Sequence, residues 1–241
     1  MNVAELYAPP STAHASEPPA PLLAPTPFTI RSLVDEAWAS YKAQWLPLSG
    51  VTLVFGILFL GFDAFCTWEA ERVGTWWAPA AARLVSILFS AFLTPGLIRI
   101  WLHAARRQSF SLATLFLGVD VYFTSLFGAI VSAVLILAGT ICLVVPGVVV
   151  AVALQLVPWL VAERRANAWD SIHLSFRLTR GHRGQLAALL VVVWLVTTGG
   201  VFACGVGLLA AYPLGQLMLA HAYRHLAGDA RSERASPLTL G

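Results

Sequence analysis

Long apolar segments alternate with short polar ones along most of this 241-residue chain. Several apolar windows hold about 18 or more residues without a charge, which is enough for a helix to cross roughly 30 Å of hydrocarbon. The uncharged run from Val121 to Ala162 is too long for one helix, and Pro146-Gly147 is the natural place for it to fold back. The pattern predicts six spanning helices, at about Leu46–Cys66, Ala82–Ala105, Val121–Val144, from Pro146-Gly147 to Val161, Gln185–Cys204 and Val206–Ala222.

Three shorter segments carry apolar residues on one helical face and polar residues elsewhere. They precede the first, third and fifth predicted spans, so the chain consists of three units, each a surface helix followed by a hairpin. Such helices suit the boundary between lipid headgroups and acyl chains. The predicted fold class is therefore all-α, a polytopic membrane protein with six transmembrane helices and three interfacial amphipathic helices. The apolar faces are Val34, Trp38, Tyr41 and Trp45; Leu112, Leu115, Phe116 and Val119; and Trp169, Ile172 and Phe176.

Helix ends are indicated at two of these segments. Ser32 with Asp35, and Asn167 with Asp170, have the spacing of N-terminal capping residues. Gly181 is suited to the left-handed conformation that closes a helix. These signals predict that the first surface helix begins near Ser32 and that the third lies between Asn167 and Gly181.

The chain divides into three regions. Residues 1–27 hold seven of the fourteen prolines, which favours an extended, disordered cytoplasmic tail. Residues 28–226 form the six-span membrane domain, and residues 227–241 form a short polar cytoplasmic tail. Within the domain, we expect a polar connection at Thr67–Ala78, whose tryptophans mark a membrane edge, and a kink at Thr94-Pro95-Gly96.

Composition supports a membrane protein. Hydrophobic residues make up 58% and charged residues 11%, against about 45–50% and about 25% in soluble domains. The net charge of +3 does not indicate nucleic-acid binding, because the arginines lie at the ends of apolar segments rather than along one groove. If the N-terminus is cytoplasmic, thirteen of the fifteen Lys and Arg residues face the cytoplasm and Arg72 and Arg83 face outward. This predicts a multi-pass protein of the bacterial inner membrane with both termini inside.

Two strongly polar side chains fall inside predicted spans. Arg99 is expected to extend to the cytoplasmic surface or to pair with Asp120 or Glu163. Gln155 needs a partner at mid-span, so it is a candidate for an inter-helix hydrogen bond, with a substrate contact as the other interpretation. The cysteines, Cys66, Cys142 and Cys204, lack metal-ligand spacing and are interpreted as buried apolar residues, although a disulfide between two of them stays open.

A basic cluster flanks the third surface helix. Each basic side chain near an anionic leaflet contributes about 1 kcal/mol, so this cluster could hold phosphate headgroups. The competing interpretation is that it only fixes topology. Its members are Arg164, Arg165, Arg177, Arg180 and Arg183.

Signatures of catalysis are missing from the sequence. It contains no HExxH, no GxSxG and no phosphate-binding glycine loop. The histidines have no ligand-like spacing, so neither a metal nor another cofactor is expected. We therefore expect a protein that is not an enzyme.

The second half of the chain carries one set of residues that is informative as a group: Pro146, Gly147, Asp170, Ser171, Ser175 and Gly181. With these residues the chain resembles a broad bacterial family of six-span membrane proteins, which includes the membrane domain attached to some glycerophosphodiester phosphodiesterases. The resemblance covers about Phe28 to Leu226. It implies an all-helical inner-membrane protein, and it does not carry over the phosphodiesterase activity, because the catalytic domain is not in this sequence.

Two functions fit these observations. The first is envelope or lipid organisation, or partnership with another membrane protein, by a non-enzymatic protein whose partners are membrane lipids, anionic ones in particular, a membrane protein or a second copy of the chain. The alternative is a transporter or channel for a small or lipid-like substrate, with bends at Pro95, Pro158 and Pro213 as its moving parts.

Overall fold

The computed structural model describes residues 28–142, 144–164, 167–202 and 207–228. Over these ranges the chain is helical and has no strand, which confirms the all-α class. The two predicted tails lie outside the described residues, apart from 227 and 228. In chain order the elements are α1 (Ile30–Ala43), α2 (Trp45–Val73), α3 (Ala78–Ala105), the 3-10 helix η2 (Leu112–Val121), α4 (Tyr122–Cys142), α5 (Val144–Leu154), α6 (Val157–Ala162), α7 (Ala168–Thr179), α8 (Arg183–Phe202) and α9 (Leu208–Ala227).

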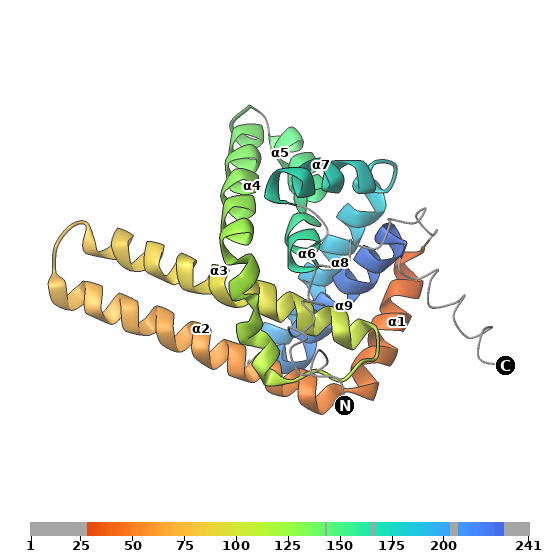
Figure 1. Ribbon diagram of the computed structural model, residues 1–241, viewed down its shortest axis with the longest axis horizontal. Helices are drawn as coiled ribbons and strands as arrows, with labels where there is room; N and C mark the ends of the chain where they lie inside the picture. The colour runs from red at the N-terminus through yellow and green to blue at the C-terminus, as the bar shows by residue number, and fades with distance from the viewer. Residues whose placement is uncertain (1–27, 143, 165–166, 203–206, 229–241) are drawn as a thin grey trace, which may run out of the picture.

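The elements repeat a short helix followed by a helical hairpin. The short helices α1, η2 and α7 precede the packed pairs α2–α3, α4–α5 and α8–α9. Figure 1 shows the α2–α3 and α4–α5 hairpins pointing in different directions from a shared base. The order matches the three units expected from the sequence.

Four stretches of the described chain are long and apolar enough to cross a membrane: Trp45–Val73, Ala78–Ala105, Leu112–Ile141 and Arg183–Phe202. The expected fourth span is broken between α5 and α6, because the Pro158 nitrogen has no hydrogen to continue the helix. The expected sixth span corresponds to α9, which is not among the four. A membrane location is thus supported by four helices, and the count of six stays a prediction.

The buried core lies around the C-terminal half of α9. Leu217, Tyr223 and Leu226 are fully buried there, with α1, α2, α3 and α8 packed around the helix. Away from this centre large apolar side chains are exposed, such as Ile57 on α2 and Trp194 on α8. A surface of this kind suits contact with lipid chains.

Helix boundaries differ from the expected ones at three places. Thr29, not Ser32, is the N-cap of α1; its hydroxyl accepts a hydrogen bond from the Ser32 backbone nitrogen at 3.2 Å, and Ser32 completes the capping box at the third helical position. The expected connection at Thr67–Ala78 is helical as far as Val73, and Gly74 closes α2 with a φ of 65°. The sixth predicted span ends at about Ala222, whereas α9 continues to Ala227.

The second surface helix is wound more tightly than expected. In a 3-10 helix three residues make a turn, so Leu115, Gly118 and Val121 share one buried face of η2. Leu112, Phe116 and Val119 are more than half exposed. The α-helical spacing assumed for the expected apolar face does not hold, because Leu115 packs inward while the other three residues are exposed. That this exposed face lies at a membrane boundary stays a prediction.

Gly96 in α3 makes this packing possible. A Cβ on Gly96 would lie 2.8 Å from Leu115 Cα and still closer to the Leu115 carbonyl. The Thr94-Pro95-Gly96 sequence lies within one continuous helix, α3, and its glycine provides the contact surface for η2.

Candidate functional site

The predicted basic cluster is divided by the fold. Arg177 and Arg180 are exposed at the end of α7, and Arg183 begins α8 with its guanidinium 5.8 Å from the centre of the Phe176 ring. Within the described ranges, none of these three arginines pairs with an acidic side chain. We call Arg177, Arg180 and Arg183 the basic edge. Arg165 lies outside the described residues.

Arg164 belongs to a different site, because it pairs with Asp120 at the end of η2. Arg99 reaches the same carboxylate from α3, with its two terminal nitrogens 3.2 and 3.1 Å from the Asp120 oxygens. Arg99 Nε also donates to the Ala162 carbonyl at 2.8 Å. The expected pairing of Arg99 with Asp120 is confirmed, and Arg99 serves to join α3, η2 and α6.

Glu163 holds a second group of charges beside the first. Its carboxylate pairs with Arg106 and accepts a hydrogen bond from the Tyr223 hydroxyl at 2.7 Å. On the next residue of α9, Arg224 donates to the Ala105 carbonyl at 2.6 Å. These contacts attach the ends of α3 and α6 to the buried part of α9.

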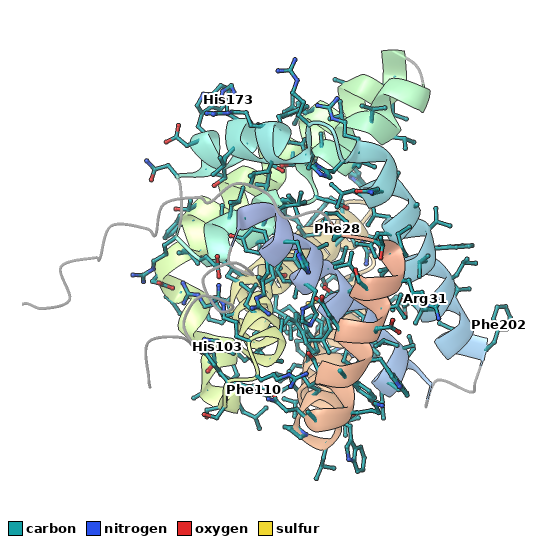
Figure 2. The ribbon with its side chains drawn as sticks, turned by 90° about the vertical axis from the view of Figure 1, so that its right-hand side faces the viewer. Phe28, Arg31, His103, Phe110, His173 and Phe202 are labelled. Atoms are coloured by element: carbon teal, nitrogen blue, oxygen red, sulfur yellow. The ribbon has the colours of Figure 1, made fainter. Side chains whose placement is uncertain are left out.

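A third polar group connects α1 to α9. Glu36 Oε2 accepts a hydrogen bond from His225 Nε2 at 3.1 Å and lies 3.4 Å from His221 Nδ1. The hydrogen bond from His225 is the main influence that lowers the pKa of Glu36 below its usual value. Phe28 lies beside this group, with its ring 5.9 Å from the His225 ring and tilted against it, and Figure 2 shows it next to the start of α1.

In the same polar group, a serine and a histidine have the spacing of a catalytic nucleophile and its general base. Ser40 Oγ lies 3.1 Å from His221 Nε2, and Glu36 lies behind the ring. However, the Ser40 residue is only 2% exposed, so a substrate carbonyl cannot approach its hydroxyl. Within the described ranges, no three His, Cys, Asp or Glu residues could hold a metal ion. The geometry therefore describes a buried hydrogen-bond network.

Gln155 lies at the break between α5 and α6, and the oxygen and the nitrogen of its side-chain amide are both buried. Neither atom has a hydrogen-bond partner in the part of the chain that the structure describes, so the expected inter-helix hydrogen bond is not observed. The side chain lines a cavity between α3, α4 and the α5–α6 break.

The residues that carried the family resemblance have structural positions. Ser171 and Ser175 form the fully buried face of α7, and Ser175 Oγ donates to the Ala153 carbonyl at 2.6 Å. Gly147 lies in α5, not in the turn, and a Cβ there would come within 2.8 Å of the Thr140 backbone of α4. Gly181 follows α7 with a φ of 91°, as expected.

The two remaining residues of the family resemblance, Asp170 and Pro146, each lie near the start of a helix. Asp170 is exposed in the first turn of α7, where a negative charge is favourable. Asn167 takes the N-cap position but makes no side-chain capping bond, so the expected capping box was wrong. Pro146 lies in the first turn of α5.

Sequence reasoning missed two polar contacts. The Glu36 group could have been suspected because Glu36 and Ser40, like His221 and His225, are four residues apart on one helix. Arg83 pairs at 3.3 Å with Asp63, a residue of the preceding helix that nothing in the local sequence connects to it. Cys66, in the same helix, is a free thiol, and Cys204 lies outside the described residues.

Comparisons with protein-family models, with curated proteins and with solved structures gave no match. The resemblance stated from the sequence motifs therefore stays a prediction, and the function must be argued from the residues described above.

Proposed function

We propose that this chain is a non-enzymatic integral protein of the bacterial inner membrane that binds anionic lipid headgroups at its basic edge and organises lipid around it. The observation that carries the proposal is that Arg177, Arg180 and Arg183 lie close together in the chain where α7 meets α8 and have no acidic partner among the described residues. In contrast, Arg72, Arg83, Arg99, Arg106 and Arg164 all have one. Arg31 and Arg107 also lack an acidic partner there, but neither has a second such arginine near it in the sequence.

The surroundings of the basic edge favour a membrane surface. Trp169 is 58% exposed on α7, the amphipathic helix that ends at the edge. Tryptophan prefers the headgroup region, and arginines beside it attract phosphate groups. A lipid phosphate at the edge would supply the negative charge that the described protein residues do not.

Native mass spectrometry of gently extracted protein tests the proposal. The variant Arg177→Gln/Arg180→Gln should lose co-purified phosphatidylglycerol that the wild type retains. The matched control is Arg72→Gln/Arg83→Gln, which removes two arginines already paired with Glu69 and Asp63. Equal retention by wild type and the α7 variant would refute headgroup binding and leave the arginines as topology signals.

Transport of a small or lipid-like substrate is the second candidate, favoured by the cavity beside Gln155. Flux into liposomes that disappears in Gln155→Leu would support this function. Retention of lipid at the basic edge without any flux would support the first.

A further inference from the structure

A cavity of about 480 Å³ lies between α3, α4 and the α5–α6 break. Figure 1 shows α4 crossing α3 and then leaving it, so the two hairpins are not packed together along their length. The cavity has the size of small-molecule pockets, which hold roughly 300–1,000 Å³.

The cavity opens at an apolar side of the molecule. Ile87 of α3 and Ile130 of α4 both line it, and they are 52% and 54% exposed. Both residues belong to stretches that are long and apolar enough to cross a membrane. A molecule dissolved in the hydrocarbon layer could therefore enter from the side.

The polar groups inside the cavity are of two kinds. Ser90 and Thr94 already donate to helix carbonyls, at 2.8 Å to Ile87 and 2.7 Å to Ser90. In contrast, the Gln155 amide and the Ser132 hydroxyl are buried without partners in the part of the chain that the structure describes. Buried groups of this type are costly to leave unpaired, so a ligand that satisfies them gains affinity and orientation.

We infer that this cavity binds a neutral single-chain lipid with a hydroxyl headgroup. In the structure the polar atoms of Gln155 and Ser132 expose almost no surface to the cavity, so the Gln155 side chain turns toward it as the lipid enters. The hydroxyl then donates to the Gln155 amide oxygen and accepts from the Gln155 amide nitrogen or from Ser132, and the chain lies along the apolar wall. A carboxylate is disfavoured because no Lys or Arg is among the cavity-lining residues. The inference does not depend on the basic edge.

Photocrosslinking of the full chain in detergent tests this site, with a long-chain alcohol that carries a diazirine in its chain as the probe. We expect labelled peptides from residues 87–94 and 125–136. Unlabelled 1-hexadecanol should compete at about tenfold lower concentration than hexadecane, because only the alcohol pairs with Gln155. Labelling elsewhere, or equal competition by the two molecules, would overturn the inference.

Two variants separate the contribution of the Gln155 hydrogen bond from that of the cavity volume. Gln155→Met keeps a similar side-chain length without the amide, so it should abolish the tenfold preference for the alcohol. Thr94→Val is the matched control, because the Thr94 hydroxyl is already used, and it should keep the preference. Ala151→Phe fills the cavity and should reduce all labelling. A preference that survives in Gln155→Met would assign the probe to another site.

Discussion

Ser175 Oγ on α7 donates a hydrogen bond of 2.6 Å to the carbonyl of Ala153, two residues before the break between α5 and α6. In a continuous helix this carbonyl would accept from the backbone nitrogen of Val157, four residues on. Because α5 ends at Leu154, the serine takes the place of that donor. A side chain from a later unit thus completes a helix end in the middle one.

Ser175→Ala should therefore destabilise the protein by about 1–3 kcal/mol, the usual cost of an unpaired buried acceptor. The measurement is thermal unfolding in detergent, followed by circular dichroism. Thr197→Ser, which keeps a hydroxyl that serves only its own helix, is the control. An unchanged transition in Ser175→Ala would mean that another donor satisfies Ala153.

Gly200→Ala should destabilise the α8–α9 hairpin. The added methyl would lie 2.6 Å from Ala211 Cβ and 3.0 Å from the Gly207 carbonyl oxygen, so the two helices must separate. The adjacent Gly199→Ala meets nothing within 4 Å and should be neutral or stabilising by up to about 1 kcal/mol, from helix propensity. Paired unfolding midpoints check this, and equal midpoints would contradict the packing of α8 on α9.

Asp120→Asn should loosen the junction of α3, η2 and α6, because Arg99 and Arg164 both pair with this carboxylate. We expect a loss of about 1–3 kcal/mol, since charged hydrogen bonds of a partly buried group are removed. Asp35→Asn, an exposed position on α1, is the control. Limited proteolysis in the 107–111 connection should become faster in Asp120→Asn alone. If both variants are cut at the wild-type rate, Asp120 does not hold this junction.

The Glu36 contact predicts a dependence on pH. The pKa of Glu36 is lowered in the folded protein, so the carboxylate contributes stability above its unfolded pKa of about 4.5. That contribution is lost as pH falls through the lower folded pKa. The unfolding temperature of wild type should therefore decline below about pH 4.5 more steeply than that of Glu36→Gln. Parallel pH profiles would show that Glu36 makes no such contribution.

The sequence predicted the helical class and the order of short helices and hairpins, because apolar runs and helical spacing are local signals. For Arg99 it left three possibilities, contact with the membrane surface or a pair with Asp120 or Glu163, and the structure shows the pair with Asp120. The sequence did not predict the features that depend on contacts between helices distant in the sequence. The close packing of η2 on α3 depends on Gly96 in another helix, and the division of the arginine cluster follows from the pair between Arg164 and Asp120.

Gln155 shows the same limit for the candidate site. Its position within an apolar segment marked it as unusual, and we expected a hydrogen bond between helices. The cavity beside it arises from the divergence of two hairpins, which no local pattern encodes.

The most direct test of the proposed headgroup binding is lipid enrichment in nanodiscs made from phosphatidylglycerol and phosphatidylethanolamine at a fixed ratio. The lipids that remain bound after gentle removal of the bulk are counted by mass spectrometry. We predict phosphatidylglycerol above the bulk ratio for wild type and for Arg72→Gln/Arg83→Gln, and the bulk ratio for Arg177→Gln/Arg180→Gln. If the lipids retained by wild type contain phosphatidylglycerol only at the bulk ratio, the protein does not bind anionic headgroups at the basic edge.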